Sequence, residues 1–92
     1  MKSALQSEKE CYLCKSQQGL ERHHCLHGTA NRKNAERRGL TVWLCQAHHR
    51  GNSGVHMDSK IDTYFKRLAQ TFYEQNIGTR DEFRREFGKS WL

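Results

Sequence analysis

The sequence contains no proline and no long apolar run, and each absence excludes a class of architecture. Without about 20 consecutive apolar residues, no segment is expected to span a membrane. Without proline or a low-complexity stretch, no linker divides the 92 residues, so we expect a single domain. Only 35% of the residues are hydrophobic, and a domain this small has a thin core, so an additional constraint on the fold is expected.

Acidic residues are also in the minority. Ten Asp and Glu stand against sixteen Lys and Arg, which gives a formal net charge of +6. A basic surface of this kind suits a polyanionic partner, and nucleic acid is the expected one; a merely solvated basic surface is the alternative. The first residues carry no apolar signal region, which predicts a cytoplasmic location.

The chain divides by composition into three parts. Residues 1–10 form a polar leader, and residues 11–92 are expected to form one domain. Within that domain, residues 11–57 hold every cysteine and histidine, and residues 58–92 are expected to form a helical extension. The predicted fold class is α+β: a small zinc-stabilised fold with a two-stranded antiparallel hairpin and C-terminal helices.

Two short segments, residues 20–23 and 40–44, have strand character and lead into the cysteines and histidines. The polar, basic segment between them, residues 25–39, is expected to be a long functional loop in which residues 34–38 can form a helical turn. Those two strands would pair as the predicted hairpin.

Residues 58–92 carry the clearest helical periodicity. A first helix is expected between the N-cap Asp58 and Gly78, with Asp62 paired to Lys66 one turn on. A second is expected after the capping box of Thr79 and Glu82. The apolar stripe of the first helix consists of Ile61, Tyr64, Phe65, Leu68, Phe72 and Tyr73. This stripe should pack on the metal-binding half, residues 11–57, and the tail at residues 91–92 should dock on the core.

The four cysteines could form disulfides or bind metal, and the expected reducing location favours metal. Cys11-x-x-Cys14 and Cys45-x-x-His48 have the spacing of two halves of a structural zinc site, because a two-residue gap lets neighbouring ligands reach one tetrahedral ion. Cys25 does not fit this spacing and is interpreted as a core residue, with a ligand role in place of His48 as the alternative.

The remaining histidines form an unusual pattern: the pair His23-His24 ends the first predicted strand, and His49 directly follows the zinc ligand His48. In this pattern the chain resembles the HNH, or ββα-metal, endonucleases over residues 11–57. The longer string from Leu20 to His56, with residues 87–90, is similar to small phage and prophage HNH proteins.

The resemblance implies a metal-dependent DNA endonuclease in which His24 is the general base. It implies that His23, His49 and His56 hold a catalytic divalent ion, which could be Zn, Ni, Co, Mn or Mg, with imidazole ligands favouring the transition metals over Mg. His27 is interpreted as a solvated or phosphate-facing residue.

The sequence departs from the family pattern at the middle asparagine, whose place is taken by Leu40. Asn34, with Asn31 as the alternative, is therefore expected to complete the catalytic site. Four basic residues of the same segment are expected to contact DNA phosphates, namely Arg32, Lys33, Arg37 and Arg38.

Two other functions are compatible with the same residues. The first is a non-catalytic zinc-binding module that recognises nucleic acid through its basic segment. The second is a redox or metal-storage protein built on Cys11-x-x-Cys14.

Overall fold

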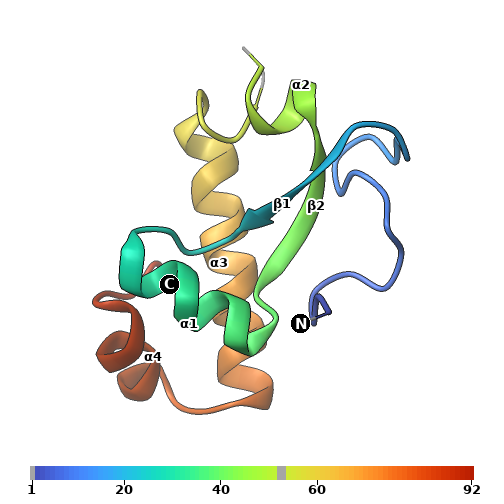
Figure 1. The fold of residues 1–92 in the computed structure, drawn as a ribbon. Coiled ribbons are helices and arrows are strands. Elements are labelled where there is room, and N and C mark those ends of the chain that lie inside the picture. The colour runs from blue at the N-terminus through green and yellow to red at the C-terminus, as the bar shows by residue number, and fades with distance from the viewer. Residues whose placement is uncertain (1, 52–53) are drawn as a thin grey trace.

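The computed structural model describes residues 2–51 and 54–92. Met1 of the expected leader, and Asn52 and Ser53 between His49 and His56, lie outside the described residues. The described chain forms a small α+β fold with a two-stranded antiparallel hairpin and helices (Figure 1). The elements are β1 (Leu20–His24), α1 (Thr29–Arg38), β2 (Thr41–Cys45), α2 (Gln46–His49), α3 (Ser59–Asn76) and α4 (Arg80–Phe87).

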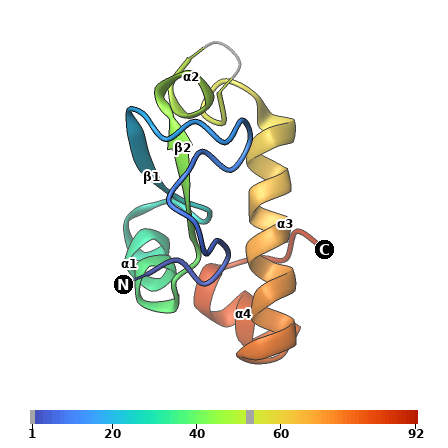
Figure 2. The same cartoon turned by 90° about the vertical axis from the view of Figure 1, so that its right-hand side faces the viewer.

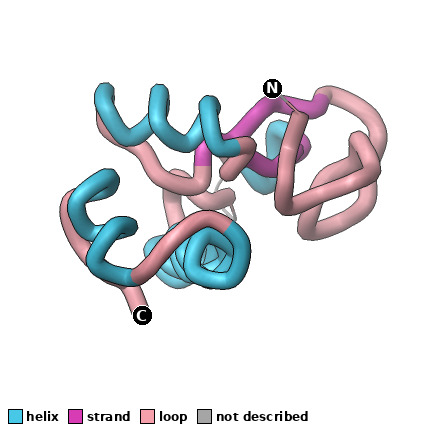
Figure 3. Tube along the Cα trace, turned by 90° about the horizontal axis from the view of Figure 1, so that it is seen from below, coloured by secondary structure: helices cyan, strands magenta, loops and turns pink. Residues whose placement is uncertain are grey.

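The hairpin packs against α3, while α1 and α4 lie together beyond one end of the hairpin (Figures 1 and 2). Seen from below, α1 and α4 lie to one side of α3 and the N-terminal segment to the other (Figure 3). The pairing of β1 with β2 places Leu20 opposite Cys45 and His23 opposite Val42. His23 and His24 therefore lie at the end of the hairpin opposite Val42 and Thr41, while Cys45, in the second half of the predicted zinc site, lies at the other end.

The two C-terminal helices begin where local capping predicts. Asp58 accepts a hydrogen bond from the Lys60 backbone N–H at 2.9 Å, and Asp62 pairs with Lys66 at 2.8 Å. The capping box of Thr79 and Glu82 is formed in both directions. These helix boundaries are confirmed, because the signals that set them are contained within a few residues of chain.

The predicted apolar stripe of α3 is confirmed in part. Phe65 and Tyr73 are buried in the core together with Ala69, but Tyr64 is 50% exposed. The tail is docked, since the Trp91 backbone N–H donates to Gln70 at 2.8 Å and its ring packs edge-on against Phe83. Cys25 is fully buried in the same core, as expected.

The expectation of a long loop over residues 25–39 is wrong, because most of it is the ten-residue helix α1. Among its residues only Ala35 is buried, so the helix has no apolar stripe from which it could be predicted. Its stability comes from α4: Asn31 donates to the Phe87 carbonyl at 3.2 Å, and the Arg38 guanidinium pairs with Glu86 at 2.9 Å. A tertiary contact therefore forms a helix that periodicity alone does not predict.

The polar segment before Cys11 covers the free edge of β2. The Ala4 backbone N–H donates to the Gly39 carbonyl at 2.7 Å, and the Trp43 backbone N–H donates to the Gln6 side chain at 2.9 Å. An exposed strand edge invites pairing with other chains, so this cover protects the hairpin.

Candidate functional site

The first cluster of possible metal ligands joins the two predicted half-sites at one end of the hairpin. Cys11 and Cys14 come from the turn before β1, Cys45 ends β2 and His48 lies in α2. Their four ligand atoms lie within 4.8 Å of one another. The Sγ atoms of Cys14 and Cys45 are 3.7 Å apart, and His48 Nδ1 lies 3.3 Å from Cys45 Sγ and 3.5 Å from Cys11 Sγ.

These spacings fit a tetrahedral ion. Zn–S bonds of about 2.3 Å and Zn–N bonds of about 2.0–2.1 Å give edges of about 3.8 Å between sulfurs and about 3.6 Å between sulfur and nitrogen. Burial opposes ionisation of Cys11, but backbone N–H groups around its sulfur lower its pKa to about 6, which favours the ligating thiolate. All four cysteines of the chain are free thiols. The cluster can therefore hold a metal ion such as zinc.

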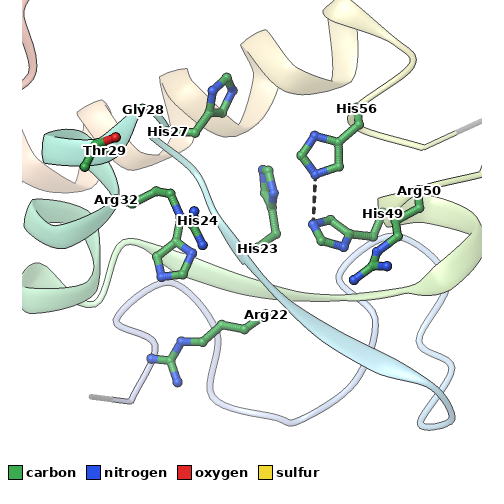
Figure 4. Close-up of a pocket in the computed structure, with 10 residues that line it drawn as sticks. All are labelled: Arg22, His23, His24, His27, Gly28, Thr29, Arg32, His49, Arg50 and His56. Atoms are coloured by element: carbon green, nitrogen blue, oxygen red, sulfur yellow. Dashed lines mark hydrogen bonds between the residues drawn. The ribbon is translucent and has the colours of Figure 1, made fainter.

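The second cluster lies beside the first and consists of three histidines from three different segments. His23 comes from β1, His49 from the end of α2 and His56 from the turn before α3 (Figure 4). Their ligand nitrogens lie within 4.8 Å of one another, and the Nε2 atoms of His49 and His56 are 3.0 Å apart. Nitrogens this close can share one ion with bonds of about 2.0–2.1 Å.

His23 is the buried member of this cluster, with 2% of its surface exposed. Within the described part of the chain, its Nε2 atom is buried and has no hydrogen-bond partner. Burial, followed by the nearby His49 and His56, lowers the pKa of His23 to about 3, so its imidazole stays neutral. A neutral, buried and unpartnered imidazole nitrogen is what a metal ligand requires.

Glu21 orients His49 and was not predicted from the sequence. Its carboxylate accepts a hydrogen bond from His49 Nδ1 at 2.8 Å and pairs with Arg50 at 2.9 Å. The hydrogen bond from His49 is the main reason that the pKa of Glu21 lies below its usual value. Carboxylates commonly hold the outer nitrogen of a metal-binding histidine in this way. Strand alternation was the available signal, because Glu21 and His23 lie two residues apart on one face of β1.

We predict that Glu21→Gln weakens metal binding at the three histidines by about 10- to 100-fold, because the amide is a poorer acceptor for His49 Nδ1. Calorimetric titration of the zinc-loaded protein with Co²⁺ or Ni²⁺ measures this change. Glu74→Gln is the matched control, since Glu74 pairs with Arg80 near the C-terminal end of α3 and belongs to neither cluster. Equal affinities in the two variants would contradict an orienting role for Glu21.

His24 lines the same pocket as the three histidines, which has a volume of about 490 Å³. Its Nε2 atom donates to Glu36 Oε1 at 2.9 Å, and this bond is the main cause of the lowered pKa of Glu36. Arg22 also pairs with Glu36, at 3.1 Å. The Nδ1 atom of His24 is thus left for another partner. Because β1 ends at His24, neighbouring residues 23 and 24 both reach one pocket despite strand alternation.

The structure does not bring every predicted residue to this pocket. Asn34 lies on the side of α1 that faces α4, where its amide donates to the Glu86 carbonyl at 3.3 Å and its oxygen accepts from Arg37. Arg38 forms a two-pronged pair with the Glu86 carboxylate. The two asparagines and Arg38 therefore tie α1 to α4. Of the four predicted basic residues, Arg32 lines the histidine pocket.

Lys33 and Arg37 lie on an adjoining hollow of α1. This hollow, of about 500 Å³, shares His24, Thr29 and Arg32 with the histidine pocket. The two hollows adjoin at these three residues, and together they are called the groove, with Arg50 lining one hollow and Arg37 the other. Its basic residues come from β1, α1 and the end of α2.

Comparison with protein families, with curated proteins and with solved structures found no match for this chain. Among the described residues, no helix has the length and apolar character needed to cross a membrane. The site is therefore interpreted from its own geometry and chemistry.

Proposed function

We propose that this protein is a metal-dependent DNA endonuclease of the HNH type. One observation carries the proposal: three histidines that can share an ion and a fourth histidine held by a carboxylate line a single basic pocket. The pocket stands beside a Cys3His cluster with the geometry of a structural zinc site. The resemblance of residues 11–57 to the HNH nucleases points to the same function.

In the proposed reaction, His24 is the general base. Glu36 holds its Nε2 atom, so Nδ1 would take a proton from the water that attacks the scissile phosphate. His23, His49 and His56 would hold a divalent ion, which would supply polarisation of the phosphate and charge stabilisation for the departing 3′ oxygen. The all-imidazole ligand set suits Zn, Ni, Co or Mn better than Mg. Arg32 and the largely exposed Arg50 would draw the phosphate into the pocket.

The groove along α1 supports DNA as the substrate. Arg32, Lys33 and Arg37 line the part of the groove next to His24 and would contact phosphates on either side of the scissile one. Arg38 forms two hydrogen bonds to the Glu86 carboxylate, so we propose no phosphate contact for it. A phage origin, and with it a bacterial host cell, belongs to the same proposal because it follows from the resemblance, and a cytoplasmic location is proposed with it.

Metal-dependent nicking of supercoiled plasmid tests the proposed function. Zinc-loaded protein is expected to nick DNA only after addition of Mn²⁺, Co²⁺, Ni²⁺ or further Zn²⁺, and EDTA should stop the reaction. If the folded protein binds DNA but cuts it with none of these ions, the function is that of a non-catalytic nucleic-acid-binding module instead.

We also predict that the double variant Arg32→Ala/Lys33→Ala weakens DNA binding at every sequence. Loss of two phosphate contacts should lower the slope of log affinity against log salt by about 2. Fluorescence anisotropy with a labelled duplex, measured without divalent metal at several salt concentrations, gives this slope. Arg84→Ala/Arg85→Ala on α4 removes the same charge away from the groove, and an equal loss there would contradict a specific contact surface.

A further inference from the structure

A third histidine–carboxylate pair, His27 with Asp62, lies beside the histidine pocket and has no part in the proposed reaction. His27 Nε2 donates to Asp62 Oδ1 at 2.9 Å, and the other oxygen of Asp62 pairs with Lys66 at 2.8 Å. His27 lies between β1 and α1, whereas Asp62 lies in the first turn of α3. The pair therefore joins two segments across the mouth of the site.

His27 lies on the same side of the pocket as His56, one of the three candidate metal ligands. It lines the histidine pocket and also a neighbouring hollow of about 280 Å³, and it shares both with His56. The second hollow that His24 lines is instead formed by residues of α1. In Figure 4 the ring of His23 stands between those of His24 and His56, and His27 enters from the side of α3. His24 and His27 thus approach the pocket from different sides.

The surroundings of the pair suit proton transfer. The side chain of His27 is 45% exposed, so its free nitrogen is open to a substrate, while that of Asp62 is 19% exposed. Burial opposes ionisation of Asp62, but hydrogen bonds from Lys66 and His27 hold its pKa below the usual value. An ionised carboxylate orients the imidazole and stabilises its protonated form. Since Nε2 is bound to Asp62, Nδ1 is the nitrogen that would exchange a proton with a substrate.

Hydrolysis of a phosphodiester requires two proton transfers. The attacking water must lose a proton, and the departing 3′ oxygen must gain one because a free alkoxide is a poor leaving group at neutral pH. One histidine on one side of the phosphate cannot serve both oxygens of an in-line displacement at once. A second histidine, on another side, can supply the second proton.

We propose that His27 is the general acid of this site and that Asp62 is its positioning residue; the inference rests on the proposed nuclease function. The water oxygen forms a bond to phosphorus while His24 Nδ1 takes a water proton. The P–O3′ bond breaks, its electron pair stays on O3′, and His27 Nδ1 gives its proton to that oxygen. The products are a 5′-phosphate and a 3′-hydroxyl, and both histidines return to their starting states by exchange with solvent.

The test compares two leaving groups. A duplex oligonucleotide carries a single 3′-bridging phosphorothiolate, whose departing sulfur needs no proton, and its twin has the ordinary linkage. Cleavage at that linkage is read from fragment length for wild type, His27→Ala, His27→Gln, Asp62→Asn and His24→Ala with one metal ion throughout. Circular dichroism and zinc content confirm that each variant is folded.

His27→Ala is expected to cut the ordinary linkage about 10²-fold more slowly than wild type and the sulfur linkage at a nearly equal rate. His27→Gln should behave like His27→Ala. Asp62→Asn should lose less cleavage rate on the ordinary linkage, and the sulfur linkage should restore that rate. His24→Ala should cut both linkages slowly. Equal slowing of His27→Ala on both linkages, or no slowing, would overturn the role of His27 and leave the nuclease function standing. If the wild type cuts neither linkage, the proposed function fails and this inference fails with it.

Discussion

Replacement of Cys11 by serine is expected to unfold the domain under conditions in which the wild type is folded. Binding of structural zinc contributes on the order of 10 kcal/mol of folding free energy, and domains of this kind are stable by only about 5–15 kcal/mol in total. Cys11 is fully buried and supplies one of four ligand atoms of the cluster. Serine leaves its hydroxyl in that position, where it is a much weaker ligand than a thiolate.

The measurement is zinc content together with far-ultraviolet circular dichroism during thermal unfolding. Cys25→Ala is the matched control, because Cys25 is equally buried but lies outside the cluster. It should keep one structural zinc and lose roughly 1–2 kcal/mol. EDTA in excess should unfold the wild type and leave Cys11→Ser unchanged. A folded, zinc-free Cys11→Ser protein would show that the cluster is not the main constraint on the fold.

Replacement of His24 by alanine is expected to lower the rate of DNA cleavage by about 10²- to 10⁴-fold, because the attacking water then lacks its proton acceptor. The side chain of His24 is 19% exposed and donates one hydrogen bond, to Glu36, so the fold and the zinc content should persist. Single-turnover nicking of supercoiled plasmid at saturating protein measures the rate without the contribution of binding.

Glu36→Gln provides a graded comparison for the same step. The amide still contacts His24 but does not hold its Nε2 proton as a carboxylate does, so a smaller loss of rate is expected. Unchanged cleavage by His24→Ala, in protein that still needs added divalent metal, would remove His24 from the reaction and assign the base to another group.

Signals confined to a few neighbouring residues predicted much of this fold. The cap at Asp58 and the capping box of Thr79 and Glu82 set the starts of α3 and α4. The two strands were placed to within one residue at each end. The spacing of Cys11, Cys14, Cys45 and His48 predicted a cluster that the structure brings together.

Local signals of this kind did not predict the helix α1. Its sequence is polar and charged, it buries only Ala35, and its N-cap Gly28 makes no side-chain capping bond. It is held by contacts to α4 across more than 45 residues of sequence, from Asn31 to Phe87 and from Arg38 to Glu86. Asn34, which was expected to complete the catalytic site, also binds α4, because its amide donates to the Glu86 carbonyl.

The sequence by itself determined that Cys11, Cys14, Cys45 and His48 can share one ion, because ligand spacing is a local property, whereas the grouping of His23, His24 and His49 was implied by the resemblance to the HNH nucleases. The tertiary structure decided which carboxylate holds each histidine: Glu21 for His49, Glu36 for His24 and Asp62 for His27, at separations of 28, 12 and 35 residues. A hydrogen bond of about 3 Å depends on where whole elements pack, and no local pattern of residues encodes that packing.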